Sequence, residues 1–196
     1  MREKPETSSL PPALQRVALA LRTFGGISFW LQLILGVISG LILVFASISG
    51  SVGRQTAQGS SNQGTGFGVF FAICGLVTLG VGAYFAFRYT RIAKDLRESN
   101  AAGRPSKADT LQIIRLGLIV NLVGMLLTII GAQAIVGSIL AKSLSQPQGA
   151  LGFGAVDLNR FVQPLDLFVV QANTNTIAAH FVGIAASLWL FNRVNR

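Results

Sequence analysis

Charged side chains are scarce in this chain. They make up 12% of its 196 residues, against roughly 25% in an ordinary soluble domain. Hydrophobic residues reach 51%, so the shortage of charge is matched by an abundance of apolar side chains. The composition argues against a soluble globular domain and indicates a membrane protein.

Residues that commonly carry out chemistry are also few. The chain has one cysteine, Cys74, and one histidine, His180, which excludes an intramolecular disulfide. A transition-metal site needs several His, Cys or carboxylate ligands within a few ångströms. On the side of the membrane opposite the two termini, the only carboxylate ligands are Asp157 and Asp166. Asp166 lies about 21 Å from His180 along one helix, so the two cannot share an ion. We therefore expect no metal site within one chain, although a transient path or a site shared by several copies passes this test. No nucleophile–base pair, paired carboxylates or nucleotide motif is found, so we expect neither enzymatic activity nor a cofactor.

Four long apolar blocks account for the hydrophobic residues. A membrane-spanning helix needs about 20 mostly apolar residues, and the blocks that meet this length are Ile27–Ser49, Phe67–Phe87, Leu116–Ala141 and Leu165–Phe191. The sequence therefore predicts an all-α fold, a bundle of four transmembrane helices in residues 24–196. Residues 1–23 are predicted to hold a polar terminus and a short amphipathic helix, Pro12–Arg22. This segment either lies on the inner membrane surface or extends the first span.

Basic residues fix the predicted orientation. Thirteen of the sixteen lie before the first span, between the second and third spans, or after the fourth. This positive-inside pattern places both termini on the cytoplasmic side, and it makes nucleic acid an unlikely explanation of the net charge of +9. The run Arg88, Arg91, Lys94 and Arg97 is predicted to hold anionic lipid headgroups. A specific docking surface for a partner is the alternative.

Small residues recur every seven positions in the third predicted span, at Gly117, Gly124 and Gly131. Asn121 and Thr128 fall on the same helical face. Small residues let two membrane helices approach closely, and polar ones can form hydrogen bonds across the contact. We therefore predict that this face packs against another helix.

Polar residues recur every seven positions in the fourth predicted span, at Asp166, Asn173, His180 and Ser187. Polar groups at such depth usually face the bundle interior or a wet cavity. One interpretation is a polar pathway or ligand site in which His180 titrates. The other is a structural hydrogen bond from a neutral His180 to Asn121, Gln133 or a backbone carbonyl.

Three segments resemble a known family: ISFWLQL (27–33), NLVGMLLTIIGAQAIVGSILAKSL (121–144) and PLDLFVVQANTNTIAAHFVGIAASLWL (164–190). Together they are similar to the Tic twenty-one family, also called permease in chloroplasts, which comprises four-span proteins of the chloroplast inner envelope and their cyanobacterial homologues. The resemblance implies either an iron permease or a component of protein import, and it supplies no catalytic residues. The Gly/Ser-rich loop at 50–66 and the lack of a transit peptide lead us to expect a cyanobacterial inner or thylakoid membrane. Expected partners are membrane lipids, further copies or a larger membrane complex, and a metal ion if the protein is a permease.

Overall fold

The computed structural model describes residues 11–56, 63–98, 104–144 and 162–195. These residues form four long helices: α1 (Pro12–Thr56), α2 (Gln63–Glu98), α3 (Lys107–Leu144) and α4 (Pro164–Asn195). Each contains a stretch long and apolar enough to cross a membrane. The predicted all-α architecture with four transmembrane helices is confirmed.

Local sequence signals explain where three of the helices begin. α1 and α4 start at proline residues, Pro12 and Pro164, and proline is favoured at a first helical position because its missing N–H group needs no partner there. α3 follows Ser106, whose hydroxyl accepts the backbone N–H of Asp109 at 3.0 Å. This bond satisfies one of the free donors at the helix start.

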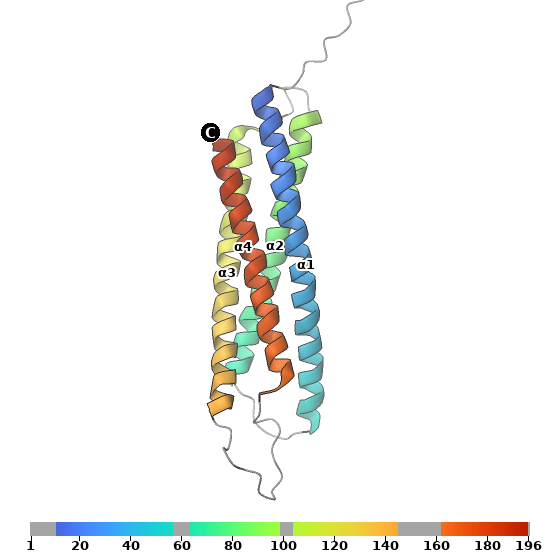
Figure 1. Cartoon of the computed structure of the whole chain (residues 1–196), viewed down its shortest axis with the longest axis vertical. Coiled ribbons are helices and arrows are strands. Elements are labelled where there is room, and N and C mark those ends of the chain that lie inside the picture. Colours follow the sequence, from blue (N-terminus) through green and yellow to red (C-terminus); the bar gives the residue numbers. More distant parts are fainter. Residues whose placement is uncertain (1–10, 57–62, 99–103, 145–161, 196) are drawn as a thin grey trace, which may run out of the picture.

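The helices alternate in direction along the bundle (Figure 1). Each packs against two neighbours in the cyclic order α1, α2, α3, α4, and α2 also touches α4 across the centre. The start of α1 and the end of α4 therefore lie at the same end of the molecule (Figure 1). We call this the basic end, because it carries the basic residues before the first span and between the second and third.

All four helices are longer than a bilayer requires. They contain 45, 36, 38 and 32 residues, whereas about 20 suffice to cross the hydrocarbon. Residues 12–22 are the first turns of α1, and the helix has no break after residue 23. At this end the helices enclose an apolar core that includes Leu21, Tyr89, Ile114 and Leu190.

Between the two ends, the bundle has polar residues inside and large apolar residues outside. Leu41, Phe45 and Val77 are each more than half exposed. The buried polar residues of this middle region are Ser28, Gln32, Ser39, Asn121, Thr128, Asn173, Thr176, His180 and Ser187. An apolar exterior of this extent suits lipid rather than water. The chain is an integral membrane protein.

Candidate functional site

Three buried side chains from three helices form a polar layer in the middle of the bundle: Gln32 of α1, Asn121 of α3 and His180 of α4. His180 is fully buried. Its Nδ1 lies 3.1 Å from Asn121 Oδ1, and its Nε2 lies 3.2 Å from the carbonyl oxygen of Gly75 on α2. The histidine thereby joins α4 to both α2 and α3.

The hydrogen-bond roles at His180 follow from its neighbours. Asn121 Nδ2 donates to the carbonyl oxygen of Gly117 at 2.8 Å, which turns Oδ1 toward the histidine. The Gly75 carbonyl can only accept. Both ring nitrogens therefore face acceptors, so a ring with one proton donates to one of them, and a ring with two protons donates to both.

Glycines let the helix backbones close around the polar layer. A Cβ atom added at Gly183 would come within 2.5 Å of both Asn121 Oδ1 and Gln32 Nε2. One added at Gly82 would come within 2.7 Å of Asn121 Oδ1 and 3.1 Å of Gln32 Oε1. Glycines of α2 and α4 thus lie directly against these amides, and a larger residue would displace them. The layer is closely packed from opposite sides.

The interior is also packed above and below the polar layer. Toward the basic end, the Tyr89 hydroxyl lies 3.2 Å from Ser187 Oγ and 3.4 Å from the carbonyl oxygen of Ile114. Toward the other end, which we call the outer end, Ser39 Oγ donates to the Ala172 carbonyl at 2.9 Å. Beyond it, Leu43, Ala72, Ile135 and Ala172 form a second apolar core. Buried apolar residues therefore pack on both sides of the polar layer.

The glycine repeat of α3 lies inside the bundle. Gly117, Gly124 and Gly131 are all buried, together with Asn121 and Thr128. A Cβ added at Gly124 would come within 2.5 Å of His180 Nε2. One added at Gly131 would come within 2.9 Å of backbone atoms of Ala72 and Gly68 on α2. The face packs against α2 and α4 within one chain, as the spacing predicts.

The polar repeat of α4 divides between two environments. Asn173, His180 and Ser187 are buried, and Asn173 Nδ2 donates to the Val169 carbonyl of its own helix at 3.2 Å. Asp166 instead lies at the outer end of the bundle.

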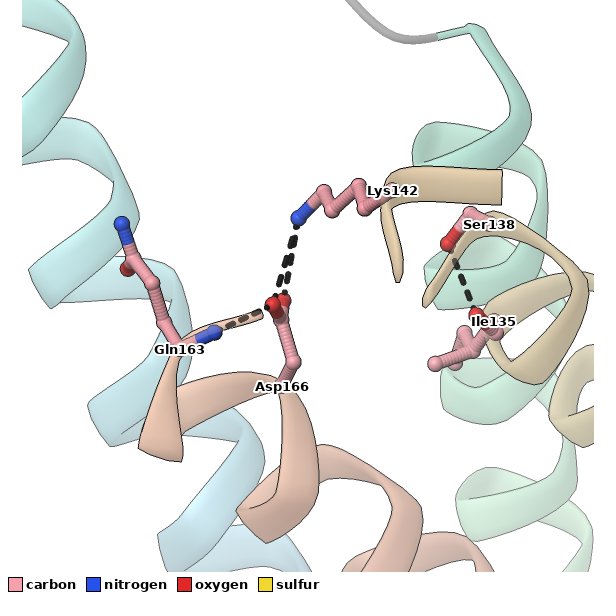
Figure 2. A network of polar contacts seen from close by, with 5 residues as sticks. All are labelled: Ile135, Ser138, Lys142, Gln163 and Asp166. Carbon is pink, nitrogen blue, oxygen red and sulfur yellow. Dashed lines mark hydrogen bonds and ion pairs between the residues drawn. The ribbon is translucent and has the colours of Figure 1, made fainter. Parts of the chain in front are cut away.

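Asp166 has a structural role at the start of α4. Its carboxylate pairs with Lys142 of α3 at 3.2 Å and accepts the backbone N–H of Gln163 at 3.0 Å. Figure 2 shows both contacts converging on the carboxylate. Asp166 therefore fixes the first turn of α4 against α3. The structure does not bring it to the polar layer.

Gln133 departs from the expectation that it could pair with His180. Its side chain is exposed on the outer half of α3, because residue 133 lies on the opposite face from the buried glycines. Gln171 of α4 is exposed as well, and its Nε2 donates to Asn175 Oδ1 at 3.0 Å. Within one chain, Gln171 is therefore not covered by protein. These amides lie on the exterior of the bundle at the depth of the predicted spans.

The basic run of α2 lies beyond the predicted span. Arg88, Arg91, Lys94 and Arg97 are all exposed at the basic end, and the Arg91 guanidinium lies 5.0 Å from the centre of the Phe87 ring. Their predicted contact with lipid headgroups stays a prediction.

Gln32 of the polar layer, together with the nearby buried Ser28 and Ser39, was not predicted from the sequence. Gln32 is 1% exposed, and its Nε2 donates to Ser28 Oγ at 2.9 Å. Its Oε1 has no hydrogen-bond partner among the described residues. A signal was present, because Ser28, Gln32 and Ser39 are spaced by four and seven residues within an otherwise apolar span, which places them on one helical face.

Metal ligands do not gather in the part of the chain that the structure describes. Those residues contain no group of three or more His, Cys, Asp or Glu side chains placed to hold an ion. Cys74 is a free, half-buried thiol on α2.

Comparisons with known proteins cover almost the whole chain. A family model described as "Protein of unknown function (DUF3611)" matches residues 11–195. The chain is 30% identical over 195 residues to "Protein TIC 21, chloroplastic" of Arabidopsis thaliana. That alignment includes 98% of this chain and 62% of the relative, so the chain spans less than two thirds of the relative's length. No solved structure matches it.

Proposed function

Since the chain belongs to the DUF3611 family, we propose that it is a non-catalytic subunit of a larger membrane complex that serves transport or import. The observation that carries this proposal is the exposed pair Gln133 and Gln171, on neighbouring helices α3 and α4. Amide groups that face hydrocarbon are costly because lipid offers them no hydrogen bonds. Gln171 Nε2 donates to Asn175 Oδ1 within its own helix, and a second protein surface, from another copy or another subunit, would supply the remaining bonds.

The packing around His180 supports the same conclusion. A permease that worked as one chain would need a path through its interior. Here the histidine is fully buried and hydrogen-bonded to two other helices, and buried apolar residues pack on both sides of the polar layer. Four-helix bundles of this kind have a packed interior rather than a pore. Transport of iron or another metal ion, the activity expected of a permease, would therefore need a path between chains.

The membrane in which we place the chain is proposed from its similarity to a named relative. The relative in Arabidopsis thaliana is named a chloroplastic protein. We place the present chain, by resemblance, in the chloroplast envelope or in the corresponding cyanobacterial membrane. Its contribution there is to hold partners together through lipid-facing surfaces of the bundle.

Assembly in a mild detergent tests the proposal. The wild-type chain, purified from its native membrane, should elute as a particle well above the 20.7 kDa of one chain, after the detergent mass is subtracted. Gln133→Leu with Gln171→Leu should shift the protein toward the single chain while leaving its helix content by circular dichroism unchanged, because neither side chain is buried. Val136→Ala with Leu167→Ala changes two other exposed residues of the same helices and serves as the control. A wild-type protein that is a single chain, or an assembly that survives the double Leu change, would contradict the proposal.

A further inference from the structure

We propose that a shallow, open groove along α1, bordered by Arg97 of α2 at the basic end, is a binding site for one anionic glycerolipid. The groove has a volume of about 770 Å³ and is lined by Leu19, Arg22, Thr23, Gly26, Ile27, Trp30, Leu31 and Arg97. It is separate from the polar layer around His180, and it includes Arg22, which the predicted headgroup site at 88–97 did not contain.

Two adjacent glycines explain why the groove exists. A Cβ added at Gly25 would come within 3.0 Å of Tyr89 Cβ and 3.1 Å of the Ala86 carbonyl oxygen, so α2 lies directly against α1 at this point. A Cβ added at Gly26 would meet nothing within 4 Å. Gly25 therefore brings the helices into contact, while Gly26 leaves an open recess beside that contact.

The two arginines converge on one end of the groove. Side chains on a helix lean toward its N-terminus. Because α1 and α2 are antiparallel (Figure 1), Arg22 leans away from the membrane and Arg97 leans toward it, so their guanidinium groups approach the same level. Both side chains are exposed, and neither makes an ion pair or hydrogen bond with the described residues. Guanidinium groups match the geometry of phosphate oxygens.

The rest of the groove suits an acyl chain. Ile27, Trp30 and Leu31 are 52%, 61% and 40% exposed, and they follow Arg22 in the direction of the predicted first span. Positive charge thus lies at headgroup level, and an apolar channel continues from it into the hydrocarbon. A lipid with a net negative headgroup fits both parts. The ammonium group of a zwitterionic lipid is repelled by the two arginines, and a soluble anion leaves the apolar part of the groove empty.

Native mass spectrometry of the purified chain tests this site, with phosphatidylglycerol and phosphatidylcholine as probes. We expect phosphatidylglycerol to bind more tightly, and Arg22→Gln with Arg97→Gln to weaken it about 30-fold, the effect of removing two basic residues near an anionic lipid. Arg115→Gln with Arg193→Gln removes the same charge from exposed positions outside the groove and should change binding less than threefold. Equal binding of the two lipids, or an equal loss in both double variants, would overturn the proposal.

A second pair of variants tests the recess without changing charge. Gly26→Leu should fill the groove and abolish selective binding of phosphatidylglycerol, while Gly80→Leu should have no effect. Both positions have no atom within 4 Å of an added Cβ, so both variants should fold. Excess inorganic phosphate should not displace the lipid, because phosphate cannot occupy the apolar channel. Unchanged lipid binding by Gly26→Leu, or displacement by phosphate, would show that the lipid does not occupy this groove.

Discussion

Replacing His180 by alanine tests whether this residue and Gln133, one of its predicted hydrogen-bond partners, contribute differently to stability. His180 is fully buried and contacts Asn121 and the Gly75 carbonyl, whereas Gln133 is exposed. His180→Ala should therefore destabilise the isolated chain, and Gln133→Ala should leave its stability almost unchanged.

The magnitude follows from what His180→Ala removes. A hydrogen bond between membrane helices contributes about 0.6 kcal/mol on average, and a neutral His180 donates one such bond. Truncating a large buried side chain to alanine adds about 2–5 kcal/mol through the cavity that it leaves. The total is about 3–6 kcal/mol, which corresponds to roughly 6–24 °C in the melting temperature of a chain of this size. Gln133→Ala, like most surface changes, should remain within about 0.5 kcal/mol.

Thermal unfolding in detergent micelles, followed by circular dichroism, measures both effects. His180→Gln adds a further comparison, because it fills most of the volume and keeps one hydrogen bond to Asn121, so it should cost about 1–2 kcal/mol. If His180→Ala melts within about 1 °C of the wild type, or if Gln133→Ala is equally destabilising, the buried polar layer does not stabilise the bundle.

Three further predictions concern packing, the outer end and topology. Gly131→Leu should destabilise the chain by at least about 2 kcal/mol, because its Cβ would lie 2.9 Å from backbone atoms of α2 and overpacking is costly. Gly137→Leu is the control, since its Cβ meets no atom within 4 Å. Equal melting temperatures of the two variants would contradict the close contact at Gly131. Asp166→Asn removes an ion pair whose side chains are 20% and 19% exposed and should cost about 1 kcal/mol, with the difference shrinking at high salt. A much larger cost that salt does not change would contradict this. Cysteines placed at Ser60 and Ser99 in a Cys74→Ser background should react with an impermeant reagent from opposite sides of sealed vesicles, and labelling from the same side would refute the predicted orientation.

The sequence predicted the fold well because a membrane constrains it strongly. Lipid offers the backbone no hydrogen-bond partners, so long apolar blocks must be helices. The seven-residue repeat of α3 also identified its buried face, because Gly117, Gly124 and Gly131 return to one side of the helix. The predicted spans were shorter than the observed helices, since the helices continue past the membrane into the apolar core around Leu21 and Ile114.

The candidate site was harder to predict, because a repeat shows which residues share a helical face. It does not show which of them lie in the middle of the bundle and which lie at its ends. Asp166 shares the repeat with His180 but lies at the outer end, where Lys142 pairs with it. Which residues of different helices meet depends on tertiary packing. The place of Gln32 in the polar layer is therefore known only from the structure, while Gln133, an equally polar residue, faces outward.

The closed interior of a single chain is the central claim, and the reactivity of interior cysteines tests it most directly. In a Cys74→Ser background, Thr128→Cys and Ser187→Cys place small thiols at buried positions, and Ser143→Cys places one at an exposed position of α3. In native membranes, a small water-soluble thiol reagent should modify the cysteine at 143 rapidly and the two interior cysteines only after unfolding. Rapid modification of either interior cysteine in the folded protein would reveal a water-filled path beside His180 and would contradict the account.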